Sequence, residues 1–319
     1  MESKHAPTLA RALRVVGTTK EPAVSVGLPP HRLILRFITS GFIRANAELR
    51  LAFWLLAINI LFAVMLTLPL YGLLDDSLGR SLMGNRSVAV PDVNWMMGFL
   101  HSNQGFLSHL SSTFLWVGLV YMLLNTLLAA GLLEVLSAEH PFSLRRFFVG
   151  IVAHGTKFLR LFGLSLVVYF IIVFVLNDLV GRGLDRWTRD WASEGGAFAL
   201  YWLKNIVPGV ALLFAIMVFD YAKIRLVMDR SNRVLTESLR ALRFVRGRRW
   251  ITLGVFYALG LVGVALALIY AGLDALLTPK SWWVLVPAFL VQQAFMFSRM
   301  WLRVAFYSSQ MELYKQTGR

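Results

Sequence analysis

Six apolar segments, each long enough to cross a bilayer as a helix, constrain this chain more than any other feature. An α-helix rises about 1.5 Å per residue, so about 20 apolar residues cross a hydrocarbon core of about 30 Å. Charged residues make up only 15% of the 319 residues, against about 25% in a soluble globular domain. The sequence therefore predicts an all-α, polytopic membrane helix bundle. Its expected spans are residues 51–74, 113–136, 161–179, 201–221, 251–277 and 282–302.

Basic residues between these segments predict the orientation of the bundle. The segment 220–250 holds nine Lys and Arg residues against three acids, a balance that resists translocation across a membrane. With six spans, 25 of the 32 Lys and Arg residues fall on one side, together with both termini. Positive charge stays on the cytoplasmic side of membrane proteins. We therefore expect both termini in the cytoplasm.

Three amphipathic segments precede the outward spans and are predicted to lie on the cytoplasmic face of the membrane. The first, His31–Glu48, places apolar residues at helical spacing opposite its arginines. The second begins at Ser143, and the third follows Ser231 or Asn232, either of which can cap a helix. The two later stripes are Leu144, Phe147, Phe148 and Ile151, and Leu235, Leu239, Leu242 and Val245.

The remaining polar segments give little indication of chemistry. Residues 1–30 lack the apolar core of a secretory signal, and they predict a disordered basic tail. His101 and His109 lie in a polar loop, residues 75–110, but the sequence has no cysteine, no Walker loop and no nucleophile elbow. We expect no catalytic residue, metal or cofactor. The net charge of +15 is spread between apolar runs, so we expect no nucleic-acid partner.

Four short segments give the chain a family resemblance. They are Gly131–Leu136 (GLLEVL), Phe142–Phe148 (FSLRRFF), Phe219–Val227 (FDYAKIRLV) and Ser238–Val245 (SLRALRFV). Together they resemble a family of six-span bacterial membrane proteins, and more distantly the membrane domain attached to some glycerophosphodiester phosphodiesterases. The resemblance implies a six-span fold in the bacterial inner (plasma) membrane. It carries over no catalytic residue, because the phosphodiesterase domain has no counterpart here.

Charged residues at matching depth form the main candidate site. Glu134, Asp220, Arg299 and Arg303 all fall near the inner ends of predicted inward-running spans. Charges near hydrocarbon cost several kcal/mol unless they are paired or can reach the interface. The cluster is therefore either a set of salt bridges that fixes helix packing, or a site where Arg299 and Arg303 bind an anionic ligand or lipid headgroup.

Two further sets of residues are candidates for contacts within and beside the bilayer. Amides inside spans form hydrogen bonds between helices or line a solute pathway; they are Asn59, Asn125, Gln292 and Gln293. Arginines on the amphipathic segments each contribute about 1 kcal/mol near an anionic leaflet. Those expected to contact lipid headgroups are Arg145, Arg146, Arg240, Arg243, Arg246, Arg248 and Arg249.

These patterns favour a non-enzymatic membrane protein, an accessory or scaffold component whose basic face contacts anionic phospholipids. A protein partner or a second copy of the chain could share that face. The alternative is a transporter or lipid-handling permease that uses the cleft between the inner-end charges. A lipid-modifying enzyme would need clustered His, Asp or Ser groups, and only the loop with His101 and His109 resembles such a cluster.

Overall fold

The computed structural model describes residues 29–78, 97, 101, 104–138, 142–188, 194–277 and 282–318. These residues are almost entirely helical and contain no strand, which confirms the all-α prediction. The α-helices are α2 (Pro30–Ala47), α3 (Leu49–Leu78), α6 (Gln104–Ser137), α7 (Leu144–Phe170), α8 (Asn177–Thr188), α9 (Glu194–Met228), α10 (Val234–Gly247), α11 (Arg249–Leu276) and α12 (Trp282–Thr317); the π-helix η1 (Ile171–Leu176) joins α7 to α8.

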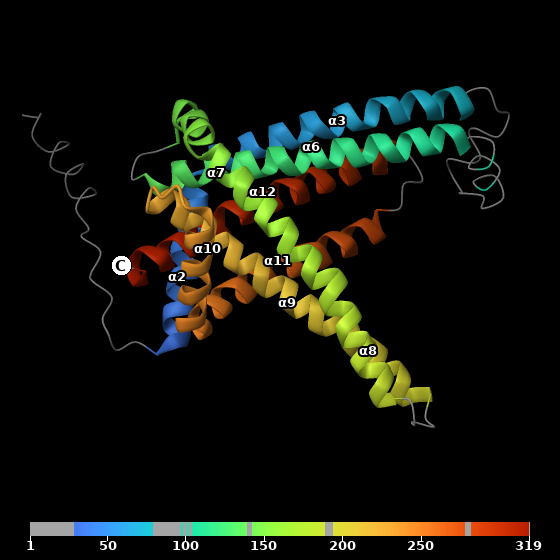
Figure 1. Cartoon of the computed structure of the whole chain (residues 1–319). Coiled ribbons are helices and arrows are strands. Elements are labelled where there is room, and N and C mark those ends of the chain that lie inside the picture. The colour runs from blue at the N-terminus through green and yellow to red at the C-terminus, as the bar shows by residue number, and fades with distance from the viewer. Residues whose placement is uncertain are drawn as a thin grey trace, which may run out of the picture.

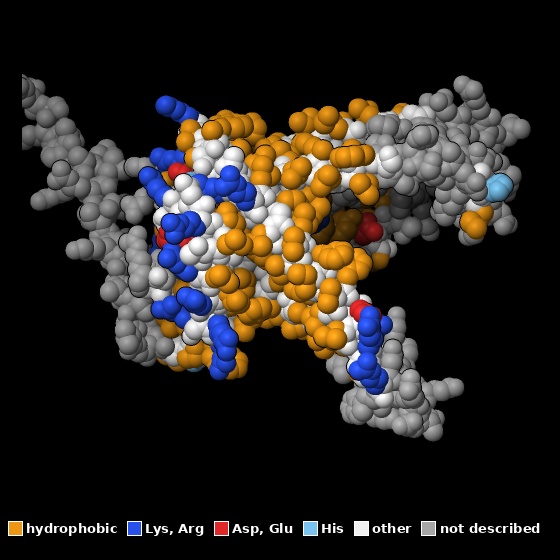
Figure 2. All heavy atoms as spheres, in the orientation of Figure 1, with side chains coloured by type: hydrophobic (Ala, Val, Ile, Leu, Met, Phe, Trp, Pro, Cys, Tyr) orange, Lys and Arg blue, Asp and Glu red, His pale blue; other side chains and the backbone are white. Residues whose placement is uncertain are grey.

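The helices converge at one end of the molecule and spread apart toward the other (Figure 1). We call the converging end, formed by α2, α10, the start of α7 and the last turns of α12, the basic end, because Lys and Arg side chains gather there (Figure 2). The buried core lies in this half and includes Leu132, Met217, Tyr221 and Val304. Beyond it, α3 and α6 form one arm, and α7, α8 and α9 form another.

Apolar side chains cover the outside of the diverging helices. Examples are Trp116 on α6, Leu268 on α11 and Leu290 on α12, all more than half exposed. Water would make such a surface unfavourable, whereas lipid tails solvate it. Three helical segments are long and apolar enough to cross a membrane, namely 114–137, 144–184 and 249–276.

The predicted count of six spans is thus matched only in part. A fourth candidate appears if α2 and the first part of α3, which meet at 72°, count as one broken span. Helices α9 and α12 are long, 35 and 36 residues, but are not counted among these candidates. Charged side chains lie along both helices, such as Asp220 on α9 and Arg299 on α12.

The first amphipathic segment forms a helix where predicted, but its apolar stripe meets protein rather than lipid. Helix α2 packs mainly against α12, with Phe37 only 1% exposed and Ala45 fully buried. Its Arg44 donates hydrogen bonds to the carbonyls of Leu136 (2.6 Å) and Ala138 (2.7 Å), and so closes the C-terminal end of α6. Helix α2 is therefore an integral part of the bundle.

The prediction of a separate second surface helix is wrong. Helix α7 begins at Leu144, directly after Ser143, and runs without a break into the predicted third span. Helix α7 packs closely on α6, since a Cβ added to Gly150 would lie only 2.5 Å from the Cβ of Glu134. Of its predicted stripe, Phe147 is buried while Phe148 is exposed.

The third amphipathic segment forms α10, and its predicted stripe is divided between two environments. Leu235 and Leu239 point outward, 65% and 59% exposed, whereas Val245 is buried on the face that also holds Glu237. Neither Ser231 nor Asn232 caps the helix; Arg233 is its N-cap residue and makes no side-chain capping bond. The leucines are thus available to a surrounding apolar phase.

Several predictions concern the ends of elements. Helix α12 continues to Thr317, so the predicted polar tail after residue 302 is instead helical and packs on α2. Helix α6 begins at Gln104, inside the predicted loop. The tail of residues 1–30, apart from Pro29 and Pro30, and most of the loop with His109 lie outside the described residues.

Candidate functional site

Polar side chains join α3, α6 and α12 where the two arms separate. The Tyr121 hydroxyl of α6 donates a hydrogen bond to the side-chain oxygen of Asn59 on α3. One turn along α6, Asn125 accepts hydrogen bonds from Arg303 of α12, at 2.8 Å to its side-chain oxygen and 3.1 Å to its carbonyl. The two amides predicted to lie within spans thus link helices, as packing amides do.

The other two predicted amides lie apart from this network. Gln292 is exposed and lines a separate pocket with Asp274. Gln293 is half-buried and lines none of the pockets described here. Only half of the predicted amide set therefore belongs to the candidate site.

The predicted charge cluster divides into two groups. Glu134 contacts His154 of α7, with 3.1 Å between the carboxylate and the imidazole nitrogen, so it stands apart from the arginines. Asp220 forms an ion pair with Lys223, 2.9 Å away on the same helix. Asp220, Arg299 and Arg303 all line one cavity. Three of the four predicted residues therefore meet, together with Lys223, which the sequence-based cluster omits.

Two cavities adjoin α12 near Arg303. The first, about 270 Å³, lies between α6, α7, α9 and α12, and its polar lining includes Tyr121, Asn125, Tyr169, Lys223 and Arg303. The second, about 520 Å³, lies between α9, α11 and α12, and is lined by Asp220, Arg299 and Arg303. Arg303 lines both cavities. The lining of the first cavity, among the described residues, contains two cations and no acid.

The first cavity also opens to the outside of the bundle. Met122 and Leu166 line it and are themselves 48% and 40% exposed on the surface of α6 and α7. Most of its remaining wall is apolar and includes Phe158, Leu161 and Phe162. Figure 2 shows the molecule hollowed between the two arms. The cavity can therefore bring an anionic group to Arg303 and an apolar chain to the same wall.

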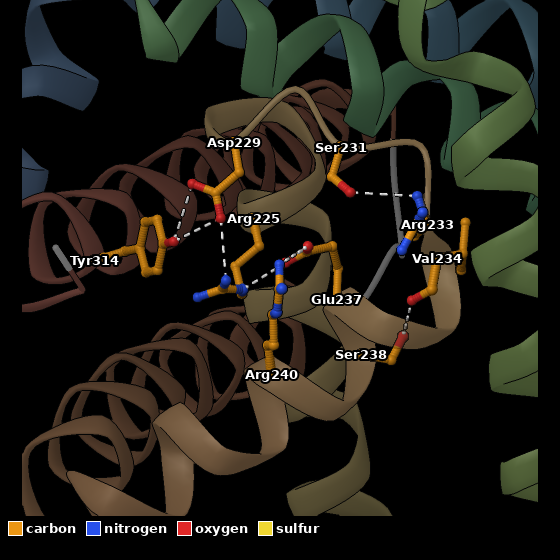
Figure 3. Close-up of polar contacts among 9 residues, drawn as sticks. All are labelled: Arg225, Asp229, Ser231, Arg233, Val234, Glu237, Ser238, Arg240 and Tyr314. Atoms are coloured by element: carbon orange, nitrogen blue, oxygen red, sulfur yellow. Dashed lines mark hydrogen bonds and ion pairs between the residues drawn. The ribbon is translucent and has the colours of Figure 1, made fainter.

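A second ionic network lies at the basic end (Figure 3). Arg225 of α9 pairs with Glu237 of α10 at 2.9 Å and with Asp229 at 3.1 Å. Glu237, 1% exposed, also pairs with Arg240 at 2.8 Å. The Tyr314 hydroxyl of α12 donates to Asp229 at 2.9 Å. Three helices are thus joined by charges that all have partners.

Tyr314 is almost fully buried against this network. Burial, reinforced by the hydrogen bond to Asp229, raises the pKa of Tyr314 to about 12. The Arg225 guanidinium lies 5.3 Å from the centre of its ring. The network was not predicted from the sequence, although one acid, Glu237, in the middle of a basic amphipathic helix was an available signal.

The arginines predicted to contact lipid headgroups have different environments. Arg145, Arg243 and Arg246 are exposed on helix surfaces. Arg248 and Arg249 are exposed and lie over the rings of Phe244 and Trp250. Arg240 is engaged with Glu237, and Arg146 is half-buried. The exposed members can reach a membrane surface, whereas Arg240 stabilises the network.

Comparison of the chain with protein-family models, with curated proteins and with solved structures gives no match. The resemblance to the membrane domain of some glycerophosphodiester phosphodiesterases therefore stays a prediction. Within the described ranges, no group of three or more His, Asp or Glu side chains is placed to hold a metal ion. The candidate site is therefore identified from the structure alone. It consists of two cavities that are lined by arginines and lie between apolar helices.

Proposed function

We propose that this protein is a lipid-handling permease of the bacterial inner membrane, without enzymatic activity, that binds an anionic headgroup at Arg303 and Lys223. The observation that carries the proposal is the first cavity, in which Arg303 has no carboxylate partner among the described residues. Lys223 lines the same cavity and pairs with Asp220, which lies outside that lining. Because Met122 and Leu166 lie at its mouth, a lipid can enter from the side. Guanidinium and ammonium groups are well suited to phosphate.

The proposed topology has six spans, with α9 and α12 as inward spans and both termini in the cytoplasm. The positive-inside rule supports it, since 25 of the 32 Lys and Arg residues then share one side. In this arrangement the basic end is cytoplasmic, and the cavities lie near the inner leaflet. Anionic phospholipids of that leaflet are the proposed partners.

Native mass spectrometry tests this function directly. The protein in a neutral detergent is titrated with dioleoylphosphatidylglycerol, and the bound fraction is compared between the original chain and Arg303→Gln. We expect Arg303→Gln to reduce lipid binding about tenfold, since a charged hydrogen bond contributes about 1.5 kcal/mol or more. The matched control is Arg243→Gln, because Arg243 is exposed on α10. Equal binding by all three chains would refute the cavity as the site.

A scaffold or accessory protein is the second candidate, favoured by the outward face of α10. Leu235, Leu239 and Leu242 are exposed beside Arg243 and Arg246. Such a face suits an anionic membrane surface, a partner protein or a second copy of the chain. The same titration separates the two functions, because a scaffold would lose lipid in Arg243→Gln and keep it in Arg303→Gln.

A further inference from the structure

The charges around the two cavities do not cancel. Lys223, Arg299 and Arg303 are cations, and Asp220 is the only acid among the described residues that line either cavity. Asp220 is occupied by Lys223 at 2.9 Å. Arg303 bonds only to the neutral Asn125, and Arg299 lies over the ring of Phe295 at 6.0 Å. No carboxylate of the described residues pairs with either arginine, which leaves two positive charges.

Arg303 is half-buried and Arg299, one turn before it, is exposed. An uncompensated cation between apolar helices, such as Arg303, is costly unless a ligand neutralises it. The two arginines are one helical turn apart and both line the second cavity, so they act on the same region. The described lining of the first cavity contains no acid, and its Tyr169 hydroxyl is a polar group suited to a phosphate oxygen. The hydroxyls of Tyr121 and Ser165 already donate to Asn59 and to the Phe162 carbonyl. A ligand with two negative charges in the first cavity would neutralise the whole group.

We propose that the headgroup bound here is a phosphomonoester, carrying close to two negative charges at neutral pH, rather than a phosphodiester, which carries one. This inference rests on the proposed lipid-binding function. Lys223 and Arg303 contact the phosphate from the first cavity. Arg299 acts through space from the second cavity and raises the preference for a doubly charged group, while Asp220 lowers the affinity for every anion.

Two lipids that differ only at the phosphate test the inference. Dioleoylphosphatidic acid is a phosphomonoester, and dioleoylphosphatidylmethanol is its methylated phosphodiester. We expect the original chain at pH 8 to bind the first about tenfold more tightly in native mass spectrometry titrations, a difference of about 1.4 kcal/mol. Equal affinities, or tighter binding of the methyl ester, would overturn the inference.

Variants that change the charge at Arg299 or Asp220 sharpen the test. Arg299→Gln should bring the affinity ratio of the two lipids close to one, and Asp220→Asn should raise the affinity for both. A gain of binding in Asp220→Asn cannot come from misfolding, so it guards against a trivial loss in the other variant. A ratio unchanged by Arg299→Gln would show that net charge does not set the preference, and would contradict the proposal.

Two other outcomes distinguish a failure of this inference from a failure of the proposed permease function on which it rests. If both lipids bind equally and Arg303→Gln weakens both, the permease proposal stands and the phosphomonoester inference fails. If neither lipid responds to Arg303→Gln, both fail. Glycerol 3-phosphate, added as a soluble competitor, distinguishes the source of the phosphate. Full displacement at a concentration equal to that of the lipid would place the ligand in solution and overturn the lipid assignment.

Discussion

The basic end and the paired cavities both contain arginines on helices, but the arginines of the ionic network at the basic end have carboxylate partners, whereas those at the cavities have none among the described residues. At the basic end, Arg225 has two carboxylate partners and holds α9 against α10. At the cavities, Arg299 and Arg303 have none among the described residues. Buried charges that are paired fix a structure, whereas an unpaired charge such as the half-buried Arg303 needs a ligand or water, and Arg299 is exposed. We therefore assign a structural role to the first region and a binding role to the second.

The largest expected effect on stability comes from removing Glu237 from the ionic network of the basic end, which we call the structural network. Glu237→Ala leaves Arg225 half-buried with only Asp229 and should destabilise the fold by about 3 to 5 kcal/mol. Thermal unfolding of the purified protein in a neutral detergent measures the loss. Arg240→Ala is the matched control, because Arg240 is 55% exposed in its own pair with Glu237 and should cost about 1 kcal/mol or less. Equal losses would show that Glu237 contributes no more than a surface charge.

Close packing between helices gives the next effect, and it tests whether the basic half is the rigid part of the molecule. Gly150→Ala would place a methyl group 2.5 Å from the Cβ of Glu134 and should cost about 1 to 3 kcal/mol. Gly163→Ala on the same helix meets no atom within 4 Å and should be neutral or stabilise α7 by up to about 1 kcal/mol. The melting temperature should fall for Gly150→Ala and should stay the same or rise for Gly163→Ala. A tolerated Gly150→Ala would mean that α6 and α7 can slide apart.

Tyr314 gives the structural network a pH dependence. Its folded pKa, about 12, lies above the ordinary value of 10.0, so its contribution is fully present below pH 10 and is lost as pH rises toward 12. Tyr314→Phe should lower stability by about 1 kcal/mol at pH 8, because the hydrogen bond to Asp229 is lost. Unfolding curves of both chains from pH 8 to 12 should converge as the original tyrosine ionises. Curves that stay parallel would show that Tyr314 titrates normally.

The positions of the helices could be predicted from the sequence because apolar runs and amphipathic periods are local properties. The bounds of α2 and α10 and the apolar lengths of α6 and α11 follow from them. The environment of each helix face could not, because lipid and protein core are both apolar. The stripe of α2 meets α12, whereas Leu235 and Leu239 of α10 face outward. Periodicity alone does not distinguish these two environments.

Partner choice among the charges was also beyond sequence reasoning. The depth of Glu134 was predicted, but its partner is His154, brought near by the crossing of α6 and α7 at Gly150. Asp220 pairs with Lys223 one turn away, which helical spacing could have indicated. The continuity of α7 from Leu144 into the predicted third span was missed because Lys157 and Arg160, near its middle, suggested an interface. Arg160 is exposed and Lys157 is half-buried, so an unbroken helix carries these charges near its surface.

The smallest expected effect on stability is also the one that separates the two regions most sharply. Arg303→Gln removes a cation that has no acidic partner and keeps an amide able to bond Asn125, so we expect a change within about 1 kcal/mol of the original stability. Removing a charge from the structural network costs several times more, because a partner is left behind. The same variant should nevertheless lose lipid binding, since Arg303 lines both cavities. Measuring unfolding and lipid binding on one preparation therefore tests both assignments. A large loss of stability in Arg303→Gln would make the cavity arginines structural, like those of the basic end.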